Sequence, residues 1–492
     1  MLFSSMVFLW VFLPIVLIIY YLTNLIIKDD KLRICVKNIV LLLASLIFYA
    51  WGGIYFLSIM IFSIVINFAG GYFISKSLND KSKKLILFIT IVLNLLVLGY
   101  FKYFNMLVVI IEQLMARGDF NTTLDNILNM RGTGALNFKT VVLPIGISFF
   151  TFQAMSYVID VYRKDASTQK NIFDFGLYVA LFPQLIAGPI VRYSDVAEQI
   201  NNRRENVIKF SKGIKRFCYG IGKKVILANT FALAVDNIYA LELSNIGMPI
   251  AILFSLSYAL QIYYDFSGYS DMAIGLGLMF GFRFKENFNY PYTAYSITEF
   301  WRRWHISLST WFKEYVYIPL GGNRHGLFRT CLNLMTVFLL TGIWHGANFT
   351  FIMWGVSYGI IQIIEKLFLL KFLNWNKLKI INFIYTFTIA VMLFVVFRCD
   401  RLEDAFTIFR QYLTFDSKYN IMTFLSMKYI IVFIFGILFM GPVQRIMAGV
   451  YEKLNKLTLI NVCDAIIQFT ILGYAILSVA DGTYNPFIYF QF

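Results

Sequence analysis

The stretch RTCLNLMTVFLLTGIWHGANFTFIMWGVSYGIIQIIE, residues 329–365, contains two apolar runs, 329–345 and 349–365, joined by a short segment. A helix crosses the roughly 30 Å hydrocarbon core of a membrane with about 20 mostly apolar residues. Each run is close to that length and carries almost no charge, so the stretch predicts a pair of membrane-spanning helices. Similar runs recur from residue 3 almost to the C-terminus.

The composition of the 492-residue chain supports the same fold class. Hydrophobic residues make up 59% of the chain and charged residues only 14%, against about 25% charged residues in a typical soluble domain. The mean hydropathy is +0.69. The apolar runs are continuous, whereas strands of a membrane barrel alternate apolar and polar residues. The sequence therefore predicts an all-α polytopic membrane protein of about 11–12 transmembrane helices, with re-entrant and interfacial helices in addition.

Basic residues set the expected orientation, because they follow every odd-numbered run among the first five. These clusters are Lys28, Lys31, Arg33 and Lys37; Lys76, Lys81, Lys83 and Lys84; and Arg163 and Lys164. Positive charge marks cytoplasmic loops, so we expect a multi-pass protein of the cell membrane with its N-terminus outside the cytoplasm. The expected spans are 3–27, two runs ending near residues 51 and 76, 85–111, 141–160, 225–240, 248–264, 329–345, 349–365, 380–397, 429–446 and 459–480.

Two stretches do not fit a simple span. Residues 177–191 are apolar but are broken by Pro183 and Pro189, which predicts a re-entrant segment enclosed by protein. Residues 203–224 contain eight basic residues and one acid, Glu205, with apolar residues at helical spacing. This pattern predicts an amphipathic helix lying on the inner leaflet. A simple lipid anchor and a role in holding an anionic donor are both compatible with it.

The net charge of +16 is explained by basic cytoplasmic loops and anionic membrane lipids, and no nucleic-acid module accompanies it. The five cysteines are far apart, so they predict neither disulfides nor a zinc site. No cleavage site follows the first apolar run, which argues against a removed signal peptide. We expect one membrane-embedded domain over 1–492, divided into N-terminal helices (1–140), a catalytic core (141–365) and C-terminal helices (366–492). Any chemistry must then take place within the membrane-embedded body.

His345 is the strongest candidate for a functional side chain. It lies in an extremely apolar stretch, where an ionisable group is costly and is by default a functional candidate. A continuous helix from Arg329 would place it about 24 Å along, inside the hydrocarbon core. Trp344 and Asn348 supply hydrogen-bonding groups beside it. The alternative is a packed histidine that hydrogen-bonds to a neighbouring helix.

The other two histidines give weaker signals. His305 follows a segment in which Trp301, Trp304 and Trp311 mix with Arg302, Arg303 and Lys313. That mixture is typical of an interfacial helix with rings at the headgroup level, and by itself it favours an interface residue over a catalyst. His325 lies in the polar GGNRHG loop, and we expect it to be exposed and without a role.

A polar group inside apolar flanks occurs at QIYYDFSGYSDMAIGLG, which contains Asp265 and Asp271. Buried carboxylates need partners or water, so a structural and a substrate-binding role are equally open. The sequence has no HExxH, P-loop or GxSxG motif. The spacing of its histidines and acids does not require a metal, and we expect none.

Six stretches together resemble a known family. They are LPIGISFFTFQAMSYVIDVYR (143–163), FPQLIAGPIVR (182–192), YYDFSGYSDMAIGLGLMFGF (263–282), NYPYTAYSITEFWRRWHISLSTWFKEYVYIPLGGNR (289–324), TGIWHGANFTFIMWG (341–355) and NPFIYFQF (485–492). The chain resembles the membrane-bound O-acyltransferases, in the branch of the alginate O-acetyltransferase membrane component. The resemblance implies a catalytic histidine at His345, in the WHG motif, and a second functional histidine at His305.

The resemblance also implies a reaction. An acetyl group passes from a cytoplasmic thioester, acetyl-CoA or a carrier thioester, to a hydroxyl across the membrane that belongs to an exopolysaccharide or cell-wall glycan. The expected partners are membrane lipids, an SGNH-type acetyltransferase outside the cytoplasm and the acceptor polysaccharide, with a possible cytoplasmic carrier protein; no bound cofactor is expected. His345 would act as general base and Trp344 or Asn348 as oxyanion donors. Asp265, Asp271, Trp304, Arg302 and Arg303 are the other candidate substrate-binding residues.

Two alternatives remain open. The first is D-alanyl transfer to teichoic acid from a carrier protein, which the same two-histidine architecture would serve. The second is a proton-coupled transporter or flippase that uses the histidines as a relay. Transporters usually contain repeated halves with paired broken helices, and the sequence shows no such repeat.

Overall fold

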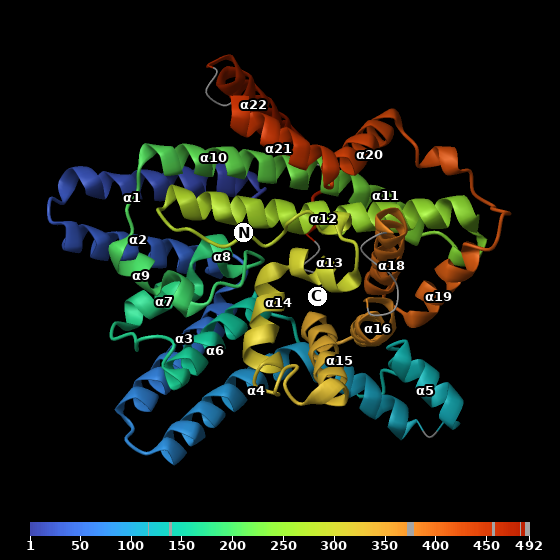
Figure 1. The fold of residues 1–492 in the computed structure, drawn as a ribbon, viewed down its shortest axis with the longest axis horizontal. Helices are drawn as coiled ribbons and strands as arrows, with labels where there is room; N and C mark the ends of the chain where they lie inside the picture. The colour runs from blue at the N-terminus through green and yellow to red at the C-terminus, as the bar shows by residue number, and fades with distance from the viewer. Residues whose placement is uncertain (117, 137–139, 371–377, 455–457, 483, 488–492) are drawn as a thin grey trace.

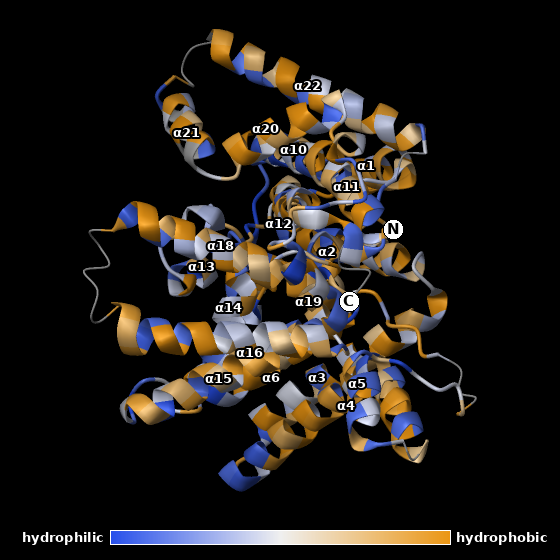
Figure 2. Ribbon diagram, turned by 90° about the vertical axis from the view of Figure 1, so that its right-hand side faces the viewer, coloured by the Kyte–Doolittle hydropathy of each residue, from blue (hydrophilic) through white to orange (hydrophobic). Residues whose placement is uncertain are grey.

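The computed structural model describes residues 1–116, 118–136, 140–370, 378–454, 458–482 and 484–487. Over these ranges the chain is helical and contains no strand, which confirms the predicted all-α class. Ten helices in the described ranges are long and apolar enough to cross a membrane. Many large apolar side chains are exposed on the outside of the protein, as expected for a surface that faces lipid. Figure 2 shows that hydrophobic residues make up much of the helices.

The helices follow one another through short connections (Figure 1). Their bounds are η1 (Phe8–Phe12), α1 (Leu13–Ile26), α2 (Asp30–Ala50), α3 (Ile54–Lys76), α4 (Asp80–Met115), α5 (Phe120–Leu128), α6 (Ile147–Arg163), α7 (Ile172–Ala180), α8 (Phe182–Leu185), α9 (Tyr193–Asn202), α10 (Val207–Gly222), η2 (Lys223–Ala228), α11 (Asn229–Tyr239), η3 (Leu243–Asn245), α12 (Gly247–Met279), η4 (Pro291–Thr293), α13 (Ile297–Arg303), α14 (Ile306–Phe312), η5 (Lys313–Tyr317), α15 (Gly326–His345), α16 (Phe349–Ile364), η6 (Glu365–Leu369), α18 (Lys379–Arg398), α19 (Leu402–Gln411), η8 (Ile421–Thr423), α20 (Met427–Phe439), α21 (Pro442–Leu454) and α22 (Thr458–Ala480).

The long helix α12 crosses the middle of the molecule, and α10 and α11 run beside it (Figure 1). Glycines allow the backbones of α10 and α12 to touch. A Cβ atom on Gly213 would lie 2.6 Å from the Gly275 carbonyl oxygen, and one on Gly220 would lie 2.7 Å from that of Gly268. Each pair is seven residues from the next on both helices, so the contact recurs every two turns along one face.

The bounds predicted for the helix over 203–224 are wrong. It begins at Val207 and is not separate from the predicted span 225–240, because Val207–Tyr239 form one continuous helix. Some of its basic side chains pair with an acid of another helix: Arg216 and Lys223 bind Asp271 at 2.8 and 2.7 Å. Asp271 lies on α12, about 50 residues further along the chain, so a local pattern of charge could not reveal it.

Two of the predicted spans are also wrong. Residues 141–160 yield only the 17-residue helix α6, which is buried on all sides from Ile147 to Val161. Residues 429–446 divide between α20, which has 13 residues, and α21, which begins at Pro442. The predicted break in 177–191 is confirmed, because α7 and α8 are separated at Leu181 and every residue of the stretch is buried. Protein therefore encloses this irregular backbone.

Helices α15 and α16 form the hairpin predicted from 329–365, and glycines bring their backbones into contact. A Cβ on Gly342 would lie within 3.0 Å of the Phe351 carbonyl oxygen, and one on Gly355 equally close to that of Phe338. On its other sides the hairpin contacts the N-terminal helices and α18. Trp344 packs against Phe149 and Phe152 of α6. The end of α15 is therefore held in the interior of the protein.

Candidate active site

His345 is the last residue of α15. Its side chain is 6% exposed, and its ring lies against Trp354 and Phe397, with ring centroids 5.1 and 5.0 Å away. The ring nitrogen Nδ1 is buried and has no hydrogen-bond partner among the described residues. The predicted continuous helix from Arg329 is confirmed, and it places the imidazole at a helix end. The structure therefore does not support the alternative of a packed histidine whose Nδ1 forms a hydrogen bond with a neighbouring helix.

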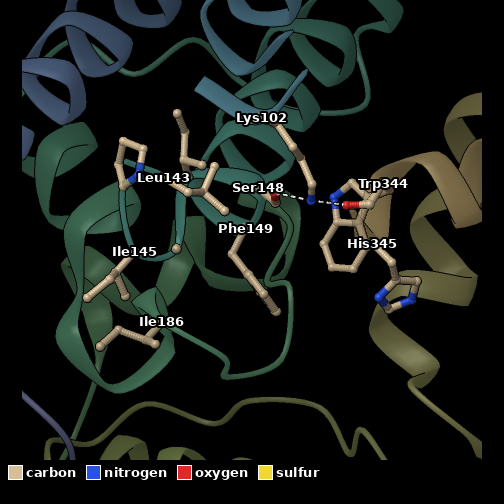
Figure 3. Close-up of a pocket in the computed structure, with 11 residues that line it drawn as sticks. Lys102, Leu143, Ile145, Ser148, Phe149, Ile186, Trp344 and His345 are labelled. Carbon is tan, nitrogen blue, oxygen red and sulfur yellow. Dashed lines mark hydrogen bonds between the residues drawn. The ribbon is translucent and has the colours of Figure 1, made fainter. Parts of the chain in front are cut away.

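A cavity reaches this histidine (Figure 3). Its volume is about 50 Å³, and its lining comprises Lys102, Leu143, Pro144, Ile145, Gly146, Ile147, Ser148, Phe149, Ile186, Trp344 and His345. Leu143 and Ile145 are partly exposed, whereas Ser148 and Trp344 are buried. The lining therefore includes both partly exposed residues and buried ones, and His345 is among the buried residues.

His305 is also buried, at 1% exposed, and a neighbouring amide fixes its tautomer. Asn287 Oδ1 accepts a hydrogen bond from the Ser307 backbone N–H at 3.2 Å. Because this oxygen can only accept, His305 Nδ1, 3.2 Å away, must carry the proton. The other ring nitrogen, Nε2, therefore keeps its lone pair, and it is buried with no partner among the described residues.

His305 adopts an uncommon backbone conformation for a residue with a side chain, with φ of 44°. Such left-handed residues cost free energy and cluster at functional sites. The ring packs edge-on against Phe266 of α12, and its centroid is 6.0 Å from that of Trp344. Trp344 therefore contacts both histidines, since its centroid is 4.9 Å from that of His345.

The prediction of an interfacial tryptophan belt around His305 is wrong. Trp301, Trp304 and Trp311 are between 4% and 7% exposed, so their rings lie inside the protein rather than at headgroup level. The rings of Trp301 and Trp304 fill the space between α12, α16 and α18, which the local sequence could not indicate. His325 is exposed, as predicted.

The remaining candidate residues do not line the cavity. The Asn348 side chain accepts from the Thr350 N–H at the start of α16 and donates to the Asp400 carbonyl at 2.6 Å. Arg303 binds Glu299 and Thr293, and Arg302 is exposed. Asp265 forms a buried ion pair with Lys224 at 2.8 Å. These contacts favour structural roles for Asn348, Arg303 and Asp265, as the pairs with Arg216 and Lys223 do for Asp271.

The sequence analysis missed two residues of the site, Lys102 and Asn287. Lys102 Nζ donates to Ser148 Oγ at 3.2 Å and to the Trp344 carbonyl oxygen (Figure 3). Its signal was present in the sequence, because a lysine inside the apolar run 85–111 is an ionisable group at membrane depth. Asn287 lies in a loop and has no comparable signal.

We expect replacement of Asn287 by alanine to impair the site. The change leaves the His305 Nδ1–H and two Ser307 donors without their acceptor, at a cost of about 1–3 kcal/mol, and it frees the imidazole to change tautomer. Acyl transfer should fall by at least about tenfold in membranes with matched protein abundance. Ser307→Ala is the control, because it removes one donor and leaves the contact between Asn287 and His305. Equal activity in both variants would contradict this role of Asn287.

Burial lowers the pKa of His305 to about 3. The unfolded side chain has a pKa near 6.5, so between these values the unfolded state binds more protons and stability falls as the pH falls. Between pH 6.5 and pH 5 His305 alone should account for a loss of about 1.6 kcal/mol. Thermal unfolding in detergent at both pH values measures the loss. The variant His305→Gln should lose about 1.6 kcal/mol less than wild type, and an identical loss would contradict the prediction.

The described residues contain no group of three or more histidine, cysteine, aspartate and glutamate side chains that could hold a metal ion. Acyl transfer between a thioester and a hydroxyl needs a base and a donor for the developing oxyanion. The buried histidines and the polar groups of the cavity can supply both. The geometry is that of an acyl-transfer enzyme whose site lies within a membrane-spanning bundle.

Comparison with known proteins agrees with this class. The model of the MBOAT, membrane-bound O-acyltransferase, family matches residues 45–402, a range that includes the cavity and both buried histidines. The chain belongs to the membrane-bound O-acyltransferase family, and the resemblance noted from its motifs is confirmed. It is accordingly a multi-pass membrane enzyme, an O-acyltransferase.

Individual relatives cover much of the chain. A protein named Probable alginate O-acetylase AlgI, from Pseudomonas aeruginosa, is 44% identical over 84% of this chain and 75% of its own length. The peptidoglycan O-acetyltransferase of Helicobacter pylori is 34% identical over 83% of this chain and 79% of its own. A teichoic acid D-alanyltransferase from Streptococcus thermophilus is 28% identical over 47% of this chain and 59% of its own.

Proposed function

We propose that this enzyme moves an acetyl group from a cytoplasmic thioester to a hydroxyl on the other side of the membrane, for O-acetylation of an exopolysaccharide or cell-wall glycan. The observation that carries the proposal is a cavity whose lining includes buried His345. Two of the relatives described above are named as O-acetylating enzymes, which favours acetyl as the group transferred. Acetyl-CoA is the proposed donor.

His345 acts as the general base. As the acceptor hydroxyl oxygen attacks the thioester carbonyl carbon, the imidazole takes the hydroxyl proton, and a tetrahedral oxyanion forms. The C–S bond then breaks, and the thiolate leaves and takes the proton back from the imidazolium. The Trp344 indole N–H is buried with no partner among the described residues, so it is available to donate to the oxyanion.

His305 serves the same site from the other side of Trp344. Its protonated Nδ1 is tied to Asn287, so its free Nε2 lone pair is a fixed acceptor. In the proposed enzyme it orients the substrate or lines the path of the donor. The N-terminus lies outside the cytoplasm, and an extracytoplasmic SGNH-type acetyltransferase or the polysaccharide itself receives the acetyl group.

The experiment uses membranes from the native host with the gene deleted or restored. Acetyl-CoA with a radiolabelled acetyl group is supplied to the cytoplasmic face, and base-labile label in surface glycan is measured. A parallel assay supplies labelled D-alanine. The proposal expects incorporation from acetyl-CoA that depends on the gene and on His345. Label that appears only in the D-alanine assay, as an ester of teichoic acid, would replace acetyl by D-alanyl transfer. Solute flux without any ester formation would overturn acyl transfer altogether.

A further inference from the structure

Lys102 is a buried lysine that lines the same cavity as His345. It comes from α4, and its side chain is enclosed, with 8% of the residue exposed. Its Nζ donates to Ser148 Oγ and to the Trp344 carbonyl oxygen, and it lies 5.6 Å from the centroid of the Trp344 ring. Figure 3 shows the Lys102 nitrogen between Ser148, which belongs to α6, and Trp344, near the end of α15.

The neighbour of Lys102 on α4 has a related contact. Tyr103 donates its hydroxyl to the Ile343 carbonyl oxygen. The last carbonyls of a helix lack partners inside the helix, so Lys102 and Tyr103 together bind two of the final carbonyls of α15. The Tyr103 hydroxyl shows that a neutral group can bind such a carbonyl. Capping of the helix alone therefore does not explain why a lysine lies at position 102.

The charge of Lys102 needs a further explanation. Among the described residues no carboxylate forms an ion pair with it, unlike buried Lys224, which pairs with Asp265. Burial of an uncompensated ammonium costs free energy, and in membrane proteins such a group marks function. As an ammonium, Lys102 has three N–H bonds. Two of them are used here, and the third is available to the cavity that Lys102 and His345 both line.

We propose that Lys102 is a catalytic residue that donates a hydrogen bond to the oxyanion formed on the acyl carbonyl. The inference rests on the proposed acyl transfer at His345. When the hydroxyl oxygen bonds to the carbonyl carbon, the C=O electron pair moves onto its oxygen, and the ammonium binds that negative charge. The charge returns to the carbonyl when the C–S bond breaks, so Lys102 gives up no proton. A cation aimed at developing charge in a water-poor site is an effective stabiliser of the transition state.

The test compares Lys102→Met with Tyr103→Phe. Each variant restores membranes of the deletion strain, and the initial rate of labelled acetyl incorporation is measured at varied acetyl-CoA. Lys102→Met should lower the maximal rate by about 10²–10³-fold, with an apparent KM within threefold of wild type, because the lost bond forms in the transition state. Tyr103→Phe, which removes only a helix cap, should stay within threefold.

A measurement of stability and a second variant distinguish a loss of catalysis from a loss of folding. Lys102→Met should unfold within a few degrees of wild type in detergent, because an apolar side chain suits the buried site. If it fails to fold, Lys102→Gln, which retains amide donors without the charge, should fold and lose at least tenfold in maximal rate. If the Lys102 and Tyr103 variants lose equally little of the maximal rate, Lys102 only caps the end of α15, and the proposal is overturned. If His345→Ala stays active in the same assay, the proposed acyl transfer itself fails; if only the Lys102 variants stay active, this inference alone fails.

Discussion

Replacement of His345 by alanine should lower acyl transfer by about 10²–10⁴-fold, the usual effect of losing a positioned general base. The folded protein should survive the change. No hydrogen bond to the His345 ring occurs among the described residues, and Nδ1 has no partner, so its removal leaves no unsatisfied group behind. The rate of labelled acetyl incorporation into surface glycan, at matched abundance in the membrane, measures the effect.

His325→Ala is the matched control, because this histidine lies on the surface near the other end of the same helix. Its activity should equal that of wild type. Near-normal transfer by His345→Ala, with the protein present at wild-type abundance, would exclude His345 as the base. Loss of the protein from the membrane would call for the near-isosteric variant His345→Gln, which should fold and be inactive.

Gly355→Val should remove most folded protein from the membrane. A Cβ at this position would lie within 3.0 Å of the Phe338 carbonyl oxygen and 3.1 Å from the Gly342 backbone. Backbone cannot move aside as a flexible side chain can, so α15 and α16 must separate. We expect a loss of at least about 3 kcal/mol, together with loss of activity, because α15 carries His345. Thermal unfolding in detergent and membrane abundance measure it.

Gly99→Val is the control for this substitution. Gly99 also lies in a membrane-spanning helix, α4, but no atom outside its own helix lies within 4 Å of a Cβ added there. Its stability should change by less than about 1 kcal/mol, the range of helix propensity. If both valine variants behaved alike, close packing between α15 and α16 would not explain the role of Gly355.

The sequence predicted the features that depend on local composition. The α15–α16 hairpin and the buried break in 177–191 follow from the length of apolar runs and the position of proline, and both are confirmed. His345 was identified because an ionisable group in an apolar stretch is recognisable from the sequence around it, without knowledge of the residues that contact it. Ten of about twelve predicted spans correspond to long apolar helices in the described ranges.

The errors over 203–224, at the tryptophans and at Asn287 share one physical cause, which is packing between different segments of the chain. Arg216 and Lys223 looked like lipid-facing charges until α12 placed Asp271 beside them. Trp304 looked like an interfacial anchor, but α12 and α18 enclose it. Local periodicity shows whether one face of a helix is polar or apolar. It does not show which other segment of the chain packs against that face. The same limit hid Asn287, whose importance lies in a contact with His305 across 18 residues.

The central claim is that a base at the end of α15 joins a donor from one side of the membrane to an acceptor from the other. The most direct test reconstitutes the purified enzyme in sealed vesicles, orients it by protease access, and places labelled acetyl-CoA and a polysaccharide acceptor, with any required partner, on opposite sides. The account predicts ester formation across the intact bilayer, with none in His345→Ala. Ester formation that requires both substrates on one side, or that continues without His345, would contradict it.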